Sequence, residues 1–116
     1  MSGAGDCIFC GIVAGTLPAQ KAGATELSYA FFDLRPVAPT HVLVVPRAHV
    51  TDAAALGPDD GDVLADMFVL ARHVAEAERL DGGYRLVFNV GEDSGNSVAH
   101  LHLHVLGGRR LAWPPG

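Results

Sequence analysis

The spacing of apolar residues predicts one long amphipathic helix in the middle of the chain. Between residues 58 and 80, apolar side chains recur three and four positions apart, which is the spacing of one face of an α-helix. Pro58 suits a first helical position, and the aspartates that follow it complement the positive end of the helix dipole. The sequence Asp81-Gly82-Gly83 then predicts the end of the helix.

Four other segments have the composition of β-strands, and a fifth predicts a short helix. The predicted strands are residues 25–34, 41–46, 84–90 and 99–106, and residues 41–46 are apolar enough to be buried on both faces. Residues 7–14 place their apolar side chains on one helical stripe. Elements in this order predict an α+β domain, with an antiparallel sheet of about five strands, one long helix and one short helix.

The predicted strand at residues 99–106 contains the most informative side chains. His100, His102 and His104 alternate with apolar residues, so a strand would project the histidines from one face, about 6.6 Å apart. Histidine is the side chain whose ordinary pKa lies closest to neutral pH. A strand that merely exposed one face to water would more naturally carry Thr, Ser, Lys or Glu. The row therefore predicts a site for nucleophilic, acid–base or metal chemistry.

Length, charge and composition narrow the classes of partner. The chain of 116 residues is expected to form one domain, residues 1–116, and 49% of its residues are hydrophobic. Only 18% are charged, which indicates that a partner covers part of the surface. The net charge of −5 and the single lysine, Lys21, argue against a long nucleic acid as ligand. A small phosphate ester is compatible, because histidines, hydroxyls and backbone N–H groups can hold one phosphate.

The sequence has no feature typical of a membrane or secreted protein. No apolar run approaches the roughly 20 residues of a membrane-spanning helix, and residues 1–6 lack the basic and hydrophobic regions of a secretory signal. We therefore expect a cytoplasmic protein with no membrane partner. Cys7 and Cys10 have Cys-x-x-Cys spacing, which in such a protein indicates metal binding or redox chemistry rather than a structural disulfide.

The histidine segment and its flanking motifs resemble the histidine-triad (HIT) superfamily. Asn89, Gly95-Asn96-Ser97-Val98 and Gly107-Gly108-Arg109 surround the histidines as in that superfamily, and the likeness extends over nearly the whole chain. Cys7-Ile8-Phe9-Cys10 resembles an opening found in the family. The ending Trp113-Pro114-Pro115-Gly116 is similar to that of the Hint branch, the nucleoside phosphoramidases. The resemblance implies a HIT-like fold that works as a homodimer, with one sheet continuing across both subunits.

The resemblance also implies an activity and a catalytic set. It implies a hydrolase of purine nucleoside 5′-monophosphate derivatives, such as the phosphoramidates AMP-NH2 and AMP-lysine, that works through a nucleotidyl-histidine intermediate. His102 matches the nucleophile, while His104 and Ser97 match residues that contact the phosphate or the leaving group. Neutral imidazole is a good nucleophile towards phosphorus, and water readily splits the resulting phosphohistidine. This chemistry requires no cofactor, and the expected ligand is a purine nucleotide or nucleoside phosphoramidate.

Further positions match nucleotide-binding residues of the family. Asn89 and Gly95 match residues that help to hold the phosphate, and Asp33 matches one that accepts hydrogen bonds from the ribose hydroxyls. An Asp before a proline-containing turn is more commonly a turn former, which is the alternative for Asp33. An apolar slot for the base is implied, with core packing as the alternative, at Ile8, Phe9, Ile12, Phe31 and Leu34.

A structural zinc ion is implied by the relatives that open with Cys-x-x-Cys. Their ligands match Cys7, Cys10, His49 and His100, and two cysteines with two histidines are a common closed tetrahedral set for zinc. Such a site would take His100 out of catalysis and hold the N-terminal segment against the sheet. The alternative is a pair of buried thiols without a metal. His41 matches a family position near the active site, but a strand histidine bonded to backbone is an equal alternative, and we leave it out of the predicted catalytic set.

Three other functions are compatible with the sequence. The first is a dinucleoside polyphosphate hydrolase or nucleotidyl transferase of the same superfamily, which the Trp-Pro-Pro-Gly ending disfavours. The second is a nucleotide-binding dimer without enzymatic activity. The third is a metalloenzyme with a catalytic zinc on His100, His102 and His104, although three alternate strand residues span a long distance for one ion.

The C-terminal tail gives one more prediction. Trp113 is the only tryptophan, and Pro114 and Pro115 follow it, so the tail is expected to be extended. Tryptophan is a favoured interface anchor. We therefore predict that residues 111–116 shape the active site of the partner subunit.

Overall fold

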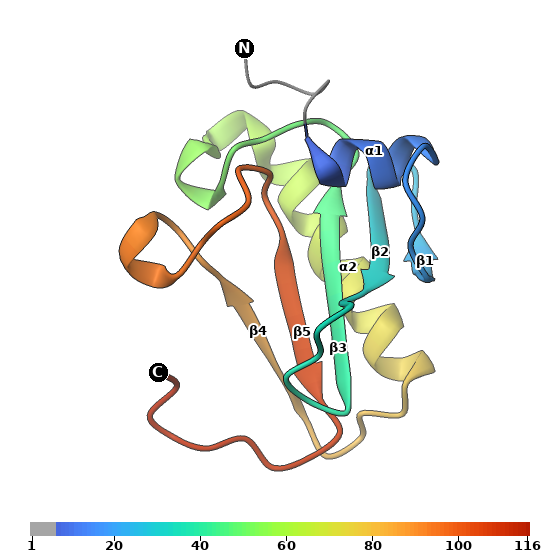
Figure 1. Ribbon diagram of the computed structural model, residues 1–116, viewed down its shortest axis with the longest axis vertical. Helices are drawn as coiled ribbons and strands as arrows, with labels where there is room; N and C mark the ends of the chain where they lie inside the picture. The colour runs from blue at the N-terminus through green and yellow to red at the C-terminus, as the bar shows by residue number, and fades with distance from the viewer. Residues whose placement is uncertain (1–6) are drawn as a thin grey trace.

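The computed structural model describes residues 7–116 and contains a five-stranded antiparallel sheet with the strand order β1-β2-β3-β5-β4 (Figure 1). The strands are β1 (Lys21–Ala24), β2 (Ser28–Phe32), β3 (Thr40–Pro46), β4 (Tyr84–Phe88) and β5 (Leu103–Gly107). Every neighbouring pair is antiparallel, which confirms the predicted α+β class. The central strand β3 is buried along its whole length, as its apolar sequence predicts.

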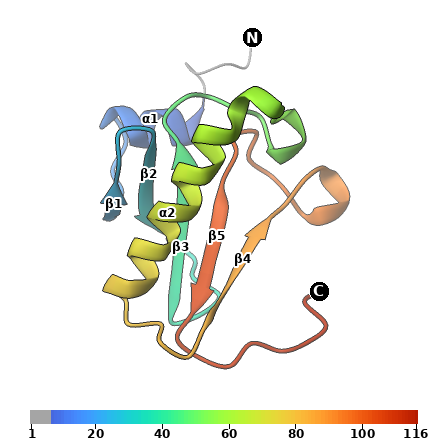
Figure 2. The same ribbon diagram turned by 180° about the vertical axis from the view of Figure 1, so that it is seen from behind.

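Helix α2 (Gly61–Ala77) covers one face of this sheet, as Figure 2 shows from behind. Its helical stripe of apolar side chains packs on the inward residues of the strands, where each buried aliphatic side chain contributes about 1.5–3 kcal/mol. The core residues of this layer include Met67, Leu70, Ala71, Val74, Ala30, Val42, Val44, Leu101, Leu103 and Val105. The sequence predicts one helix from 58 to 80, but residues Pro58–Asp60 form a separate 3-10 turn and α2 ends at Ala77.

Helix α1 (Ile8–Ala14) lies against the opposite face, near one end of the strands (Figure 1). The Sγ atom of Cys7 accepts a hydrogen bond from the Cys10 N–H group at 3.3 Å and caps the helix, while Gly15 ends it in the left-handed conformation at φ 81°. Phe9 is the buried residue of α1, and its ring meets that of Phe31 edge-on at 5.4 Å. With Leu43 and Val45 of β3, these rings form a second, smaller core.

The strand predicted at residues 99–106 is shorter than expected, which places two of the three histidines outside it. Strand β5 begins only at Leu103, which pairs with Val44 of β3. Continuing this register would place residue 101 opposite Pro46, which has no N–H group to extend the ladder. The Leu101 N–H group bonds instead to the Val50 carbonyl at 2.6 Å. His100 and His102 therefore precede the strand, although the alternation of histidines with buried leucines continues through them.

The edges of the sheet differ from the sequence prediction in two other ways. Strand β1 is not predicted, and residues 25–34 hold only β2 together with the turn before it. Strand β4 ends two residues earlier than expected, at Phe88, and β4 is the outermost strand on its side. Among the described residues, no helix is both long enough and apolar enough to cross a membrane.

Candidate functional site

The three triad histidines divide between two neighbouring sites. His100 is fully buried and faces the cysteines of α1, whereas His102 and His104 are half-buried and their rings lie 5.0 Å apart. The ring of Phe9 lies between the two sites, with its centre 5.9 Å from that of His100 and 5.2 Å from that of His102. The sequence predicts one row of equivalent histidines, but His100 turns towards the thiols and the Pro46 carbonyl, whereas His102 and His104 lie side by side.

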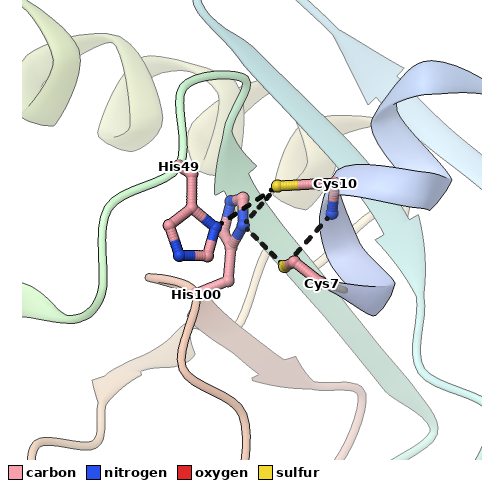
Figure 3. A group of neighbouring side chains, drawn as sticks. All are labelled: Cys7, Cys10, His49 and His100. Carbon is pink, nitrogen blue, oxygen red and sulfur yellow. Dashed lines mark hydrogen bonds between the residues drawn. The ribbon is translucent and has the colours of Figure 1, made fainter. Parts of the chain in front are cut away.

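Four donor atoms from Cys7, Cys10, His49 and His100 lie within 4.8 Å of one another (Figure 3). The cysteines come from the start of α1, His49 follows β3, and His100 precedes β5. The Nδ1 atom of His100 lies 3.2 Å from the Cys7 sulfur and 3.4 Å from the Cys10 sulfur, and Nδ1 of His49 lies 3.3 Å from the Cys10 sulfur. The predicted metal ligands are therefore together and could bind a metal ion.

The geometry and the tautomer of His100 suit a tetrahedral cation. Zinc bonds of about 2.3 Å to sulfur and 2.1 Å to nitrogen give sulfur–nitrogen separations of about 3.6 Å, close to those in this cluster. The Nε2 atom of His100 lies 3.0 Å from the Pro46 carbonyl, which can only accept, so Nε2 carries the proton. The unprotonated Nδ1 then faces the thiols, which is the arrangement that supports a metal-bound histidine. Desolvation, followed by the neighbouring Cys7, raises the pKa of Cys10 to about 11.

Backbone chemistry also fixes the tautomer of His102. Its Nδ1 atom lies 2.7 Å from the carbonyl oxygen of His100, so Nδ1 carries the proton and donates it. In the neutral ring, Nε2 then holds a free lone pair. A neutral imidazole held in this way is a nucleophile or a hydrogen-bond acceptor.

His104 carries its proton on the other ring nitrogen, Nε2, because of a chain of hydrogen bonds through His41. The N–H group of Val37 can only donate, and it lies 3.2 Å from Nδ1 of His41. The proton of neutral His41 is therefore on Nε2, which lies 2.9 Å from Nδ1 of His104. His104 accepts at Nδ1 and so carries its own proton on Nε2. That buried nitrogen has no hydrogen-bond partner in the described part of the chain, which leaves a donor ready for a ligand.

Burial keeps His41, His100 and His104 neutral near pH 7, because it lowers the pKa of each. It lowers the pKa of His104 to about 4, and the neighbouring His102 and His41 lower it further while Asp33 opposes them. Burial also lowers the pKa of His41, again against the effect of Asp33. The pKa of His100 is lowered by burial, an effect that the Pro46 carbonyl opposes. The donor at Nε2 of His104 is therefore a neutral imidazole N–H group.

A second group of possible metal ligands, Asp33, His41 and His104, does not suit a metal ion. Its donor atoms lie within 4.8 Å of one another, and the Asp33 carboxylate is 3.5 Å from Nε2 of His41. However, the Val37 N–H group keeps the His41 proton on Nε2, the nitrogen that would have to bind the metal. Neither ligand group in residues 7–116 contains His102, so the alternative of a catalytic zinc on all three triad histidines has no support in the structure.

The predicted base and ribose residues lie around one open cleft of about 420 Å³ beside α1. Phe9 and Phe31 pack in the core and also line this cleft, while Leu34 is 90% exposed at the rim. The residues of this set that line the cleft are Ile8, Phe9, Ile12, Phe31, Asp33 and Leu34. Asp33 is also a turn former, because its Oδ1 atom accepts a hydrogen bond from the Arg35 N–H group at 2.8 Å.

The three residues predicted to contact the phosphate lie in the connection between β4 and β5. Asn89 is half-buried just after β4, while Gly95 and Ser97 are exposed. The Gly95 N–H group bonds to the Glu92 carbonyl at 2.9 Å, so this N–H group is used within the loop. No hydrogen bond joins Asn89, Gly95 or Ser97 to His102 or His104 in the structure of residues 7–116.

His41 is the residue of the site that the sequence prediction omits. It lies on β3 diagonally across from His104, since Leu43 is the direct partner of His104 in the ladder. Both predicted alternatives for His41 hold at once, because its Nδ1 bonds to backbone and its Nε2 bonds to the triad. Only the register of β3 against β5 brings this contact about, and the spacing of residues in the sequence does not contain it.

Comparison with known proteins identifies the family of this fold. The family model described as the HIT domain matches residues 14–111. The chain belongs to the HIT domain family. Cys7 and Cys10 precede the matched region, so the family match covers the sheet, α2 and the triad histidines but not the thiol pair.

Individual HIT proteins match over nearly the full chain. A HIT-like protein of Synechocystis is 40% identical over 111 residues, covering 96% of this chain and 97% of the relative. The crystal structure of a HIT family hydrolase from Legionella pneumophila superposes with a TM-score of 0.93 at 45% identity, covering 96% of this chain and all of the other. A histidine triad protein from Clostridium difficile gives a TM-score of 0.88 at 38% identity, covering 92% and 94% of the two chains.

Proposed function

We propose that this protein hydrolyses purine nucleoside 5′-monophosphate derivatives, in particular phosphoramidates, through a nucleotidyl intermediate on His102. The observation that carries the proposal is the opposite polarity of the two neighbouring imidazoles. His102 offers a lone pair at Nε2, and His104 offers a proton at Nε2. A nucleophile beside a donor for the phosphoryl oxygens is what displacement at phosphorus requires.

The first step forms a bond between Nε2 of His102 and the α-phosphorus and breaks the bond from phosphorus to the leaving amine. The amine takes up one proton from solvent as it leaves. His102 becomes a positively charged phosphoryl-imidazolium, and its Nδ1–H group keeps its bond to the His100 carbonyl, which stabilises that charge. The Nε2–H group of His104 donates to a phosphoryl oxygen, and loss of such a donor typically costs about 100- to 1,000-fold in rate.

In the second step, water attacks phosphorus and the bond to His102 breaks. The nucleoside monophosphate and one proton are released, and His102 returns to the neutral form with its proton on Nδ1. The apolar cleft beside α1 suits the base, and the Asp33 carboxylate at the same cleft suits the ribose hydroxyls. HIT proteins bind nucleotides, and the C-terminal sequence resembles the Hint branch, which supports phosphoramidates over dinucleoside polyphosphates.

We further propose that the four-residue ligand cluster binds a structural zinc ion. The supporting observations are the closed set of two thiols and two imidazoles and the Pro46 carbonyl behind His100. When bound, zinc would join α1 to the segment before β5 and hold the His100 carbonyl beside His102. It would leave His102 and His104 free for the reaction.

We also propose that the protein is a homodimer in which β4 meets its copy. Strand β4 is an outer strand, and an unpaired strand edge is a template for another strand. Tyr84 and Leu86 on this strand and Phe68 on the neighbouring helix are each about two-fifths exposed, which leaves an apolar area next to the edge. A second copy would cover this area and continue the sheet.

The central test of the proposed function replaces the nucleophile. His102→Ala is expected to lower the turnover of adenosine 5′-phosphoramidate by about 1,000-fold or more, with AMP binding retained, because His102 alone attacks phosphorus. Release of AMP is followed by chromatography and binding by calorimetry. His73→Ala, on the exposed side of α2, is the matched control and is expected to leave both unchanged.

A panel of adenosine and guanosine phosphoramidates and diadenosine polyphosphates defines the substrate class. Faster turnover of the phosphoramidates is expected. Substantial hydrolysis by a pure preparation of His102→Ala would refute the mechanism, and preference for the diadenosine polyphosphates would refute the substrate class.

A further inference from the structure

The start of the C-terminal tail is joined to the active-site histidines by side-chain and main-chain hydrogen bonds. One guanidinium nitrogen of Arg109 donates to the Val37 carbonyl at 3.1 Å, and the other donates to the Arg110 carbonyl at 3.1 Å. The N–H group of the same Val37 donates to Nδ1 of His41. Val37 is thus fixed at both of its main-chain polar groups, one by Arg109 and one by His41.

The backbone approaches closely at this point, which explains how Arg109 reaches Val37. Gly108 has φ 94°, a left-handed conformation, and a Cβ atom on it would lie 2.8 Å from Cβ of Pro39. The chain after β5 therefore packs directly on the connection between β2 and β3. That connection is exposed, since Val37 is 62% exposed, and within residues 33–39 it has few buried apolar contacts to hold its peptide groups in one orientation.

The Val37 N–H group and the Asp33 carboxylate, which lies 3.5 Å from Nε2 of His41, both favour a proton on that nitrogen, and Val37 makes the shorter contact. With the N–H group directed at His41, the protons of His41 and His104 are both on Nε2. If this N–H group turns away, His41 can adopt the other tautomer and accept at Nε2. His104 must then donate from Nδ1, and its Nε2 atom faces the ligand as a lone pair. A lone pair repels a phosphoryl oxygen, whereas an N–H group binds it.

We propose that Arg109 is a positioning residue that holds Val37 so that His41 and, through it, His104 present the proton at Nε2 to the substrate. This role rests on the proposed function, since it concerns the same phosphoryl site. Arg109 touches neither the triad nor the apolar cleft in the structure of residues 7–116. Its effect therefore passes through Val37 and His41.

The test compares Arg109→Met and Arg109→Lys with Arg110→Met, a neighbouring arginine whose side chain makes no hydrogen bond in the described chain. Arg109→Met is expected to lower kcat for adenosine 5′-phosphoramidate by about three- to tenfold, with a smaller change in KM, because the charge-assisted hydrogen bond to the Val37 carbonyl is lost. Arg109→Lys keeps the charge and one donor and is expected to restore part of the rate. Arg110→Met is expected to resemble the wild type, although it loses the same charge.

Two further measurements separate positioning from general damage. In 15N-histidine NMR spectra at neutral pH, Arg109→Met is expected to show a new population of His41 protonated at Nδ1, while Arg110→Met shows none. Arg109→Met added to His41→Gln is expected to cost no further rate, because the link through His41 is already absent. If Arg109→Met does not fold, Arg109→Lys is expected to show the same NMR change in smaller amount.

The proposal is overturned if the tautomer of His41 is unchanged in both Arg109 variants, if Arg110→Met loses as much activity, or if the effects of Arg109→Met and His41→Gln simply add. These outcomes are distinct from failure of the proposed function. If the wild type does not hydrolyse phosphoramidates, the NMR comparison still decides whether Arg109 sets the tautomer of His41.

Discussion

Three histidines of the site owe their tautomers to single main-chain groups. Carbonyl oxygens of Pro46 and His100 require a proton on the nitrogen that faces them, whereas the Val37 N–H group excludes one. As a result, His100 turns an unprotonated nitrogen to the thiols, His102 keeps a lone pair at Nε2, and His41 donates to His104. The roles proposed above for these three histidines therefore depend on the backbone atom beside each one.

The buried neutral histidines lead to a prediction about stability and pH. The pKa of His104 is about 4 in the folded protein, compared with 6.5 for an ordinary histidine, and the pKa of His41 is lowered as well. As the pH falls below about 6.5, the unfolded chain binds protons that the folded chain does not, so the free energy of unfolding falls until about pH 4. Above about pH 6.5 this contribution is fully present.

Urea denaturation at about pH 7.5 and about pH 5 checks this prediction. Wild-type protein is expected to lose stability at the lower pH, and His104→Gln is expected to lose less. His73→Gln serves as the matched control, because His73 is exposed on α2 and its replacement is expected to leave the wild-type dependence intact. An equal loss in His104→Gln and wild type would contradict the assignment of this pH dependence to His104.

At the scale of elements, α1 is held by a small core and by the ligand cluster. The helix has seven residues, and Phe9 is its one buried side chain. Isolated helices of this length are unstable in water, so tertiary contacts must hold α1 in place. The two cysteines at its start contact His49 and His100, so a metal ion bound by these four residues would strengthen the attachment of the helix.

We predict one zinc ion per chain in protein purified without added metal, measured by elemental analysis. Removal of the metal by a chelator is expected to lower Tm by about 5 °C or more, because binding energy at a structural site is folding energy. At a temperature where the fold survives, the turnover rate is expected to fall much less. Cys10→Ser is expected to reproduce the loss of Tm, and metal-free protein with full stability would refute the site.

The elements show which parts of the fold the sequence could predict. Strong local patterns correctly placed α1, β3, α2 and the region of β5. Strand β1 was missed because Lys21–Ala24 contains a glycine and two alanines, has no alternation and pairs irregularly with β2. The composition of β1 is typical of a loop, and only pairing with β2 makes it a strand.

For the candidate site, the sequence predicted which ligand residues lie together but not the contacts of the triad histidines. Cys7, Cys10, His49 and His100 were expected together and lie together. The contact between His41 and His104 depends on strand register, and the separation of His100 from the other two histidines depends on Pro46. Both are long-range effects of pairing between distant segments, which local spacing does not encode.

At the scale of the whole molecule, the tail extends away from the sheet beyond β4 (Figures 1 and 2). A guanidinium nitrogen of Arg85 donates to the Ala112 carbonyl at 2.8 Å, which fixes the start of the tail beside β4. Trp113, which follows, is 80% exposed. A large exposed aromatic ring next to an open strand edge suits a contact with a second copy of the chain.

We therefore predict a dimer by sedimentation, formed along β4 and completed by the tail. Leu86→Lys on β4 is expected to shift the protein towards the monomer, because a charge would be buried at the interface. A chain truncated after Arg110 is expected to change its relative rates for phosphoramidates with small and large amine leaving groups. Thr16→Ala, on an exposed turn that is distant in sequence from β4 and the tail, is the control and is expected to change neither the oligomeric state nor the relative rates.

A truncated chain that stays dimeric and keeps the wild-type preference between leaving groups would show that the tail has no part in specificity. A monomeric wild-type protein would refute the interface itself. The two results test different contacts, since Leu86 lies within the sheet edge and Trp113 lies beyond it.

Pro46 at the end of β3 also affects the segment that precedes β5. Since its ring nitrogen carries no hydrogen, the β3–β5 ladder stops there, and the main chain from residue 100 to residue 102 is not used for sheet bonding. Outside the ladder, the segment bends so that Nδ1 of His102 meets the carbonyl of His100, two residues before it. A residue with an N–H group at position 46 would favour a longer, more regular sheet by bonding to residue 101. Residues 100 to 102 would then be fully extended, and His102 would lose this local contact. In the reaction proposed above, better sheet structure at this point would therefore mean a poorer nucleophile.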